Sequence, residues 1–110
     1  MKTIKSLLLA CALLFAASAH AEKITIAAAA DLKFAMDEIV TAFKQANAAD
    51  EVEVIYGSSG KFHTQIQQNA PYDLYFSADI GFPRELVKAG FAASDAKPYA
   101  FGRIVLWSAT

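Results

Sequence analysis

The sequence predicts an α/β fold in which helices cover both faces of a parallel sheet, giving three layers. Three segments with strand character, residues 23–28, 51–56 and 73–77, are each followed by a helical pattern. A strand and a helix that alternate in this way favour a parallel sheet joined by right-handed crossovers. After the third helix the pattern changes, and the chain ends with another strand candidate at residues 103–108.

The first unit is a strand that begins by alternating and ends in four alanines, residues 27–30. Apolar residues on both faces are typical of a strand inside a parallel sheet. Asp31 follows directly and is predicted to cap the next helix. One apolar stripe of that helix should cover the sheet. Its members are Leu32, Ala35, Met36, Ile39, Val40 and Phe43.

The second and third units are recognised by their turns. The second strand leads through Gly-Ser-Ser-Gly, residues 57–60, into a helix predicted over residues 61–68. The third strand leaves through Ala78 and Asp79. Pro83 suits the first turn of the following helix, which Gly90 should end at residue 89.

The turn at residues 57–60 has the chemistry of an anion-binding loop. Backbone N–H groups at the start of a helix lack intrahelical acceptors, and small hydroxylated residues leave space for an anion beside them. The carboxyl ends of parallel strands also share one edge of the sheet. Residues 29–31, 57–60 and 77–79 should therefore converge. Packing and capping alone would explain the same small residues, so the turn by itself leaves both interpretations open.

Residues 1–21 have the pattern of a cleavable signal peptide. Lys2 and Lys5 precede an apolar run at residues 7–17, and Ala-His-Ala ends at residue 21. This run of about eleven residues is shorter than the roughly 20 that a membrane-spanning helix needs. Export to the periplasm without lasting membrane insertion is predicted. Cys11 follows Leu-Leu-Ala, as in a lipoprotein signal, but most of the apolar run lies after it, so we interpret this as coincidence.

Cleavage would leave 89 residues, with a formal charge that falls from −1 to −3 because two lysines are removed. A mildly acidic domain without clustered Lys or Arg is not expected to bind nucleic acid. It would contain no cysteine, which excludes disulfides and thiolate metal sites. Its length suffices for one modest core. We expect one lobe at residues 22–100 and a strand at residues 101–110.

Three segments resemble the periplasmic molybdate-binding proteins of ABC importers in their order and spacing. They are ITIAAAADL at residues 24–32, YGSSG at residues 56–60 and APYDLYFSAD at residues 70–79. The resemblance implies a two-lobed type II periplasmic binding protein of which this chain is the incomplete first lobe, with residues 101–110 leading toward a second lobe. It implies a monomer without cofactor or enzymatic activity, which captures molybdate or tungstate and delivers it to a membrane permease and an ATPase.

The same resemblance assigns roles to residues at the strand exits. Ser59 falls where the family has a ligand serine, and Ala78 where it uses a backbone N–H group. Asp31 falls where many members have a ligand serine, and its carboxylate would repel a dianion. We therefore expect Asp31 to turn inward, cap its helix and offer at most its N–H group. Ser58 and Ala30 are expected to support or cap. The other ligands, including a tyrosine, would come from the second lobe, so this chain would carry half a cleft and bind weakly alone.

Other functions remain as alternatives. Related binding proteins for sulfate, phosphate or ferric ion share this architecture. A serine hydrolase could use Ser59, His63 and Asp79, although the G-x-S-x-G spacing is lacking. A phosphate loop is excluded because Ile55 and Phe62 occupy positions that require glycine and Ser or Thr. A metal site from Asp73, Asp79 and His63 has no motif spacing to support it.

Overall fold

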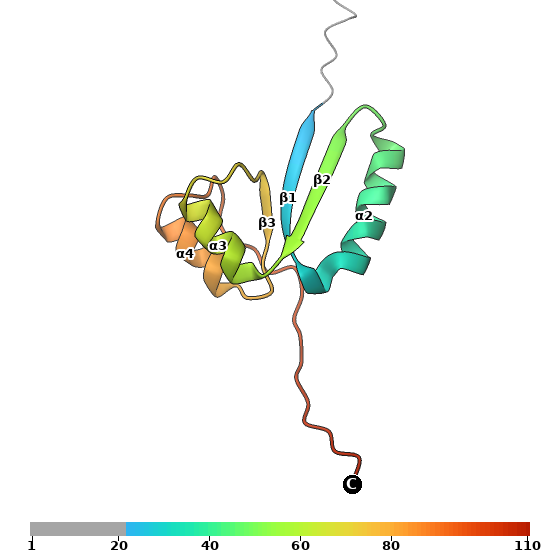
Figure 1. The fold of residues 1–110 in the computed structure, drawn as a ribbon, viewed down its shortest axis with the longest axis vertical. Coiled ribbons are helices and arrows are strands. Elements are labelled where there is room, and N and C mark those ends of the chain that lie inside the picture. Colours follow the sequence, from blue (N-terminus) through green and yellow to red (C-terminus); the bar gives the residue numbers. More distant parts are fainter. Residues whose placement is uncertain (1–21) are drawn as a thin grey trace, which may run out of the picture.

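A computed structural model describes residues 22–110 and contains a three-stranded parallel sheet. Its strands are β1 (Lys23–Ala29), β2 (Glu51–Gly57) and β3 (Leu74–Phe76), in the order β2-β1-β3. Figure 1 shows β1 between the other two strands. The predicted parallel α/β architecture is confirmed, and the predicted signal peptide, residues 1–21, lies outside the described residues.

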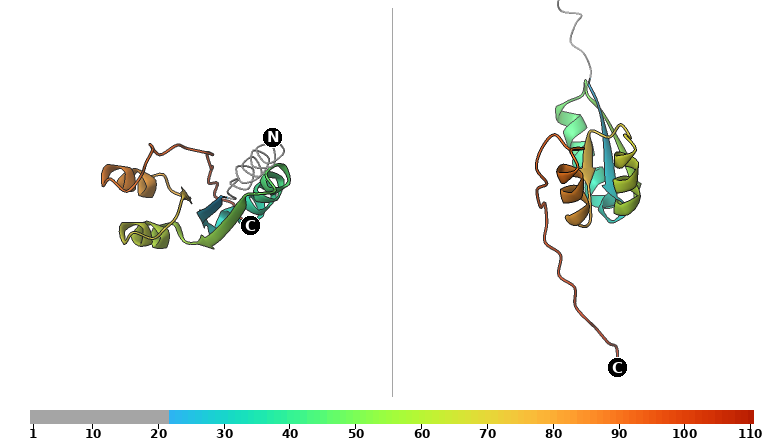
Figure 2. Two further views of the ribbon diagram at one scale, coloured as in Figure 1. Left: turned by 90° about the horizontal axis from the view of Figure 1, so that it is seen from above. Right: turned by 90° about the vertical axis from the view of Figure 1, so that its left-hand side faces the viewer.

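Helices connect and flank these strands. The 3-10 helix η1 (Ala30–Leu32) runs directly into α2 (Lys33–Ala46), which leads to β2. The helix α3 (Ser59–Gln67) connects β2 to β3, and α4 (Gly81–Lys88) follows β3. Because the chain moves from β1 to one neighbour and then back past β1 to the other, right-handed crossovers place α2 and α3 on opposite faces. The side view in Figure 2 shows the sheet between them, with α3 and α4 as neighbours.

The core on the α2 face is a small aliphatic cluster. Ile26 and Ala28 from β1 pack with Val52 of β2 and Met36 of α2. Around this cluster lie partly buried side chains from several elements, namely Ile24, Leu32, Val40, Val54, Tyr56 and Phe76.

The apolar stripe of α2 is covered less than predicted. Ala35 is exposed, and Ile39 and Phe43 remain 62% and 39% exposed. The reason is that β2 is an edge strand of the described sheet. Figure 1 shows α2 beside that edge, so the outer part of the stripe has no strand beneath it.

An aromatic cluster covers the α3 face. Phe62, only 3% exposed, meets Tyr72 and Tyr75 edge-on at centroid distances of 5.5 and 6.4 Å. Gly57, the last residue of β2, lies directly against the ring: a Cβ atom there would be 3.1 Å from Cζ of Phe62. The absence of a side chain at residue 57 is therefore what allows α3 to approach the sheet.

Several boundaries differ from those predicted. The α3 helix begins at Ser59, two residues before the predicted start, and β3 is shorter than the predicted strand over residues 73–77. No strand forms at residues 103–108, and residues 91–110 contain neither helix nor strand. A strand requires a hydrogen-bonded neighbour, whereas Figure 1 shows this segment running away from the sheet. Within residues 22–110, no helix is both long and apolar enough to cross a membrane.

A polar cluster joins the beginning of α2 to the end of β2. The Tyr56 hydroxyl donates to the Asp37 carboxylate, and Lys33 Nζ lies 2.8 Å from the same carboxylate and 4.8 Å from the centre of the Tyr56 ring. Burial, together with the hydrogen bond to Asp37, raises the pKa of Tyr56 to about 12. Hydrogen bonds from Lys33 and then Tyr56 lower the pKa of Asp37.

This cluster predicts a loss of stability at alkaline pH. The folded protein keeps the Tyr56 proton that the unfolded chain releases near pH 10, so the free energy of unfolding should fall as pH rises from there to about 12. Urea denaturation at several pH values across this range measures the slope. Tyr56→Phe should reduce the slope, whereas Tyr72→Phe, which removes a hydroxyl bonded to Gln65, should keep it. Equal slopes in the two variants would contradict this assignment.

A second prediction concerns the contact between Gly57 and Phe62. Gly57→Val should destabilise the fold by about 1–3 kcal/mol, because Phe62 is held by two tyrosines and cannot move aside. Gly102→Val is the matched control, since a Cβ atom at residue 102 would have no neighbour within 4 Å, and it should change stability by less than about 0.5 kcal/mol. Similar urea midpoints for both variants would show that the close packing is unimportant.

Candidate functional site

The three strand exits meet at one edge of the sheet. Ala29 pairs with Gly57, and Ala28 pairs with Phe76, so the strands end at nearly the same level. Figure 1 shows η1, α3 and α4 all beginning at this edge. The chain thus brings together the residues that follow the three strands.

Ser59 and Ala78 are in direct contact at this edge. The Ala78 N–H group donates to Ser59 Oγ over 2.9 Å. The Tyr75 hydroxyl donates to the Ser59 carbonyl over 2.6 Å. The Ser59 hydroxyl oxygen acts as an acceptor here, so its proton is still available for another acceptor. These two bonds tie the exit of β2 to β3 across the end of the central strand.

Ser58 and Gly60 shape the beginning of α3. Ser58 is the N-cap residue, with extended backbone angles, and its hydroxyl accepts the Lys61 N–H group over 3.2 Å. Gly60 faces Phe82 of α4, and a Cβ atom there would be 3.4 Å from the ring. The two residues on either side of Ser59 therefore hold the helix in place.

Asp31 does not cap its helix, contrary to the prediction. It lies inside η1, for which Ala29 is the N-cap residue, and α2 has Leu32 in that position. Neither cap has a side-chain hydrogen bond. The helical path begins at Ala30, two residues earlier than predicted, so Asp31 is already within the first turn. Its side chain is exposed, and the Ala30 carbonyl accepts the Lys33 N–H group.

The exit of β3 is braced by its own side chains. The buried Ser77 hydroxyl donates to the Asp79 carbonyl over 2.6 Å and accepts the Asp79 N–H group over 3.2 Å. The Asp79 carboxylate accepts the Gly81 N–H group over 2.9 Å at the start of α4. This turn fixes the peptide that carries the Ala78 N–H group.

Tyr99 also contributes to this edge, although no pattern in the sequence indicated it. Its hydroxyl donates to the Ser77 carbonyl over 2.9 Å, and its ring meets Phe76 edge-on at 5.9 Å. Burial, and secondarily the charge of Asp31, raise the pKa of Tyr99. Tyr99 lies in an irregular segment without hydrophobic periodicity, so its neighbours in the sequence do not distinguish it.

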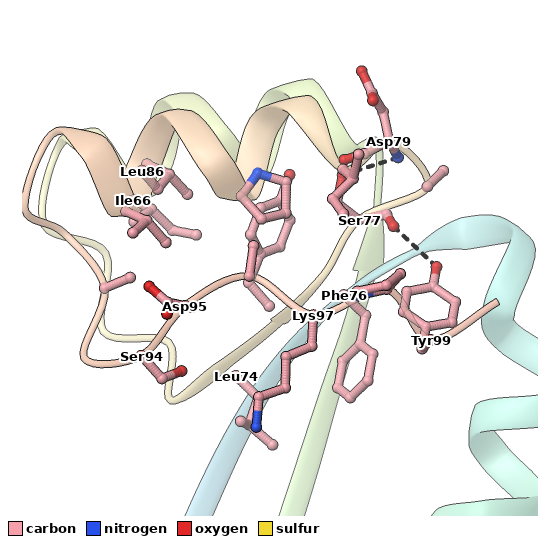
Figure 3. A pocket seen from close by; sticks show the side chains of 18 of the residues that line it. Ile66, Leu74, Phe76, Ser77, Asp79, Leu86, Ser94, Asp95, Lys97 and Tyr99 are labelled. Carbon is pink, nitrogen blue, oxygen red and sulfur yellow. Dashed lines mark hydrogen bonds between the residues drawn. The ribbon is translucent and has the colours of Figure 1, made fainter. Parts of the chain in front are cut away.

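A hollow extends from this edge between β3, α4 and the segment after α4, as Figure 3 shows. Asp31, Ala78 and Tyr99 are among the residues that line it, whereas Ser59 is not. Figure 3 also shows Lys97 in the hollow, with its amine directed toward Leu74 and away from Tyr99.

The residues of the hydrolase alternative have separate partners. His63 Nε2 lies 3.2 Å from the Glu85 carboxylate, a close approach that does not form a hydrogen bond, and its ring lies against Phe82. Asp79 is bonded to Gly81. Asp73, proposed in the metal alternative, accepts the Thr25 N–H group, and residues 22–110 contain no cluster of His, Cys, Asp or Glu suited to a metal ion.

Comparisons with known proteins agree with this architecture. Residues 24–110 match the family described as bacterial extracellular solute-binding proteins. The chain is 34% identical to the molybdate-binding protein ModA of Azotobacter vinelandii, over 87% of this chain and 38% of that protein. It is 37% identical to the ModA of Rhodobacter capsulatus, over 83% and 36% of the two chains. It thus spans a little over a third of these relatives.

The fold is also similar to a solved structure. The substrate-binding domain of a putative molybdenum ABC transporter from Clostridium difficile superimposes with a TM-score of 0.62 and 36% identity, covering 64% of this chain and 31% of that chain. Sequence match and fold agree, and the chain belongs to the bacterial extracellular solute-binding proteins.

Proposed function

We propose that this chain forms an oxyanion site of an ABC importer's solute-binding component, and that its ligand is molybdate or tungstate. The observation that carries the proposal is the hydrogen bond between Ser59 Oγ and the Ala78 N–H group, which brings two expected ligand groups to one place. The ligand is suggested by relatives that are named molybdate-binding proteins and by a neighbour described as part of a molybdenum transporter.

The donors at this edge suit a small dianion. The amides of Ser59 and Gly60 open α3 and have no intrahelical acceptor, so they point out of its positive end. The Ser59 hydroxyl can donate its proton while its oxygen still accepts from Ala78. Oriented N–H and O–H dipoles hold an oxyanion without a mobile cation, which permits reversible capture.

A site of this kind would be one side of a cleft. We propose that opposing donors come from a second lobe, as in a two-lobed binding protein, and that closure of the two lobes excludes water. The protein would act in the periplasm as a monomer and deliver its ligand to permease and ATPase subunits. The hydrolase alternative has less support, because Ser59, His63 and Asp79 engage different partners.

Titration of the chain with molybdate tests the ligand. We expect shifts of the Ser59, Gly60 and Ala78 amide resonances with an apparent Kd of about a millimolar, since one side of a cleft supplies few contacts. Tungstate should act similarly. Submicromolar affinity by calorimetry would contradict a one-sided site. Binding of sulfate without binding of molybdate would contradict the choice of ligand.

The two neighbouring serines provide a matched pair of variants. Ser59→Ala should weaken molybdate binding by about tenfold or more, because a hydrogen bond to a charged ligand is lost. Ser58→Ala should leave the affinity nearly unchanged but lower stability by about 1 kcal/mol, because it removes the helix cap. NMR titration and urea denaturation measure the two effects. Equal affinities in both variants would exclude Ser59 as a ligand.

A further inference from the structure

Asp31 follows the central strand and lines the same hollow as Ala78 and Tyr99. It is exposed and lies within η1, where it caps neither η1 nor α2. Among residues 22–110, no hydrogen bond or ion pair to its carboxylate is present. Its acceptor oxygens therefore have no protein partner among these residues, in a hollow that Ala78 also lines.

The charged and polar groups around Asp31 are already engaged elsewhere. Lys33, two residues later, pairs with Asp37 at 2.8 Å. The Tyr99 hydroxyl donates to the Ser77 carbonyl, and Figure 3 shows the amine of Lys97 directed toward Leu74. Asp79, another carboxylate that lines the hollow, is bonded to Gly81. Asp31 thus presents a negative charge that its neighbours do not neutralise.

A free carboxylate that lies beside groups able to donate hydrogen bonds to an anion can distinguish oxyanions by whether they carry a proton. An ionised carboxylate can only accept hydrogen bonds. It repels a fully deprotonated oxyanion, which has no proton to offer, whereas a protonated oxyanion can donate its O–H group to it. Near neutral pH, molybdate and sulfate carry no proton, while phosphate and arsenate carry at least one.

We propose that Asp31 admits a second class of ligand, tetrahedral oxyanions that keep a proton at neutral pH, by accepting a hydrogen bond from the protonated oxygen. The carboxylate at the same time limits the affinity for molybdate. The proposal rests on the oxyanion-binding function of the same edge, where the Ser59 hydroxyl and the amides of Ser59 and Gly60 would supply the donors for the remaining oxygens of the ligand. It makes Asp31 the residue that determines the preference among oxyanions.

NMR titration of the chain with sodium phosphate, sulfate and molybdate tests this assignment. Phosphate and sulfate are similar in size, so the ratio of their apparent Kd values isolates the effect of the proton. We expect the wild-type chain to bind phosphate more tightly than sulfate. Asp31→Ala should reduce this preference by about tenfold and should strengthen molybdate binding. Asp31→Asn, which keeps the shape and removes the charge, should also strengthen molybdate binding.

Glu38→Gln is the control, because it removes an equal charge from an exposed position on α2 outside the hollow, and it should leave the preference unchanged. Equal phosphate-to-sulfate ratios in wild type and Asp31→Ala, with molybdate still bound, would overturn the role of Asp31 and leave the proposed function intact. The same ratio change in Glu38→Gln would also overturn it. If no anion shifted the Ser59 or Ala78 amides in any variant, the proposed function would fall as well.

Discussion

The structure depends on the small side chains at the end of its central strand. Ala27 and Ala28 are completely buried, and Ala29 is 3% exposed. Strand β1 is bonded to a neighbour on each side and lies between α2 and α3, so its side chains meet packed atoms on both faces. Because alanine occupies so little volume, the loops after β2 and β3 can approach each other over the end of β1. The contact between Ser59 and Ala78 is a result of that approach.

Packing farther from the edge determines how Ser59 is presented. Gly57 allows the Phe62 ring to lie against the backbone of β2, and this contact brings the first turn of α3 close to the sheet. Tyr75 reaches from β3 to the Ser59 carbonyl, while Ser58 caps the helix beside it. The orientation of the Ser59 hydroxyl thus depends on the aromatic cluster around Phe62, on the lack of a side chain at Gly57 and on the helix cap at Ser58. All three form when the chain folds.

Local patterns were sufficient to predict the fold but not every detail of the edge. The repeated strand and helix units, the Gly-Ser-Ser-Gly turn and the glycine after α4 are short-range signals, and the parallel sheet follows from them. The convergence of Ser59 and Ala78 follows from the general rule on strand ends. Their role in holding a ligand stays a prediction. The family resemblance is confirmed by the match over residues 24–110.

The errors arose where tertiary contacts, or a shift of two residues in where a helix begins, decide the outcome. Asp31 has the right chemistry for a cap, but the 3-10 turn begins at Ala30 and moves it past the capping position. Residues 103–108 have the apolar composition of a strand but form none. A strand also needs a neighbouring strand to bond with, and local composition does not show whether one lies beside it. Tyr99 interacts with Ser77 across 22 positions of the sequence, a distance over which no local pattern carries information.

The bond between Ser59 and Ala78 also bears on how quickly the proposed oxyanion would be accommodated at this edge. Its hydroxyl oxygen and the amide beside it are held in place before any anion arrives, so the rotational freedom of this serine is given up on folding and not at the moment of encounter. Arrival of the proposed oxyanion would then require loss of its hydration shell but little rearrangement of the polypeptide at this edge. The association rate of such an ion should accordingly be controlled by diffusion and dehydration. Its dissociation rate would instead depend on the contacts that form around it after it has arrived.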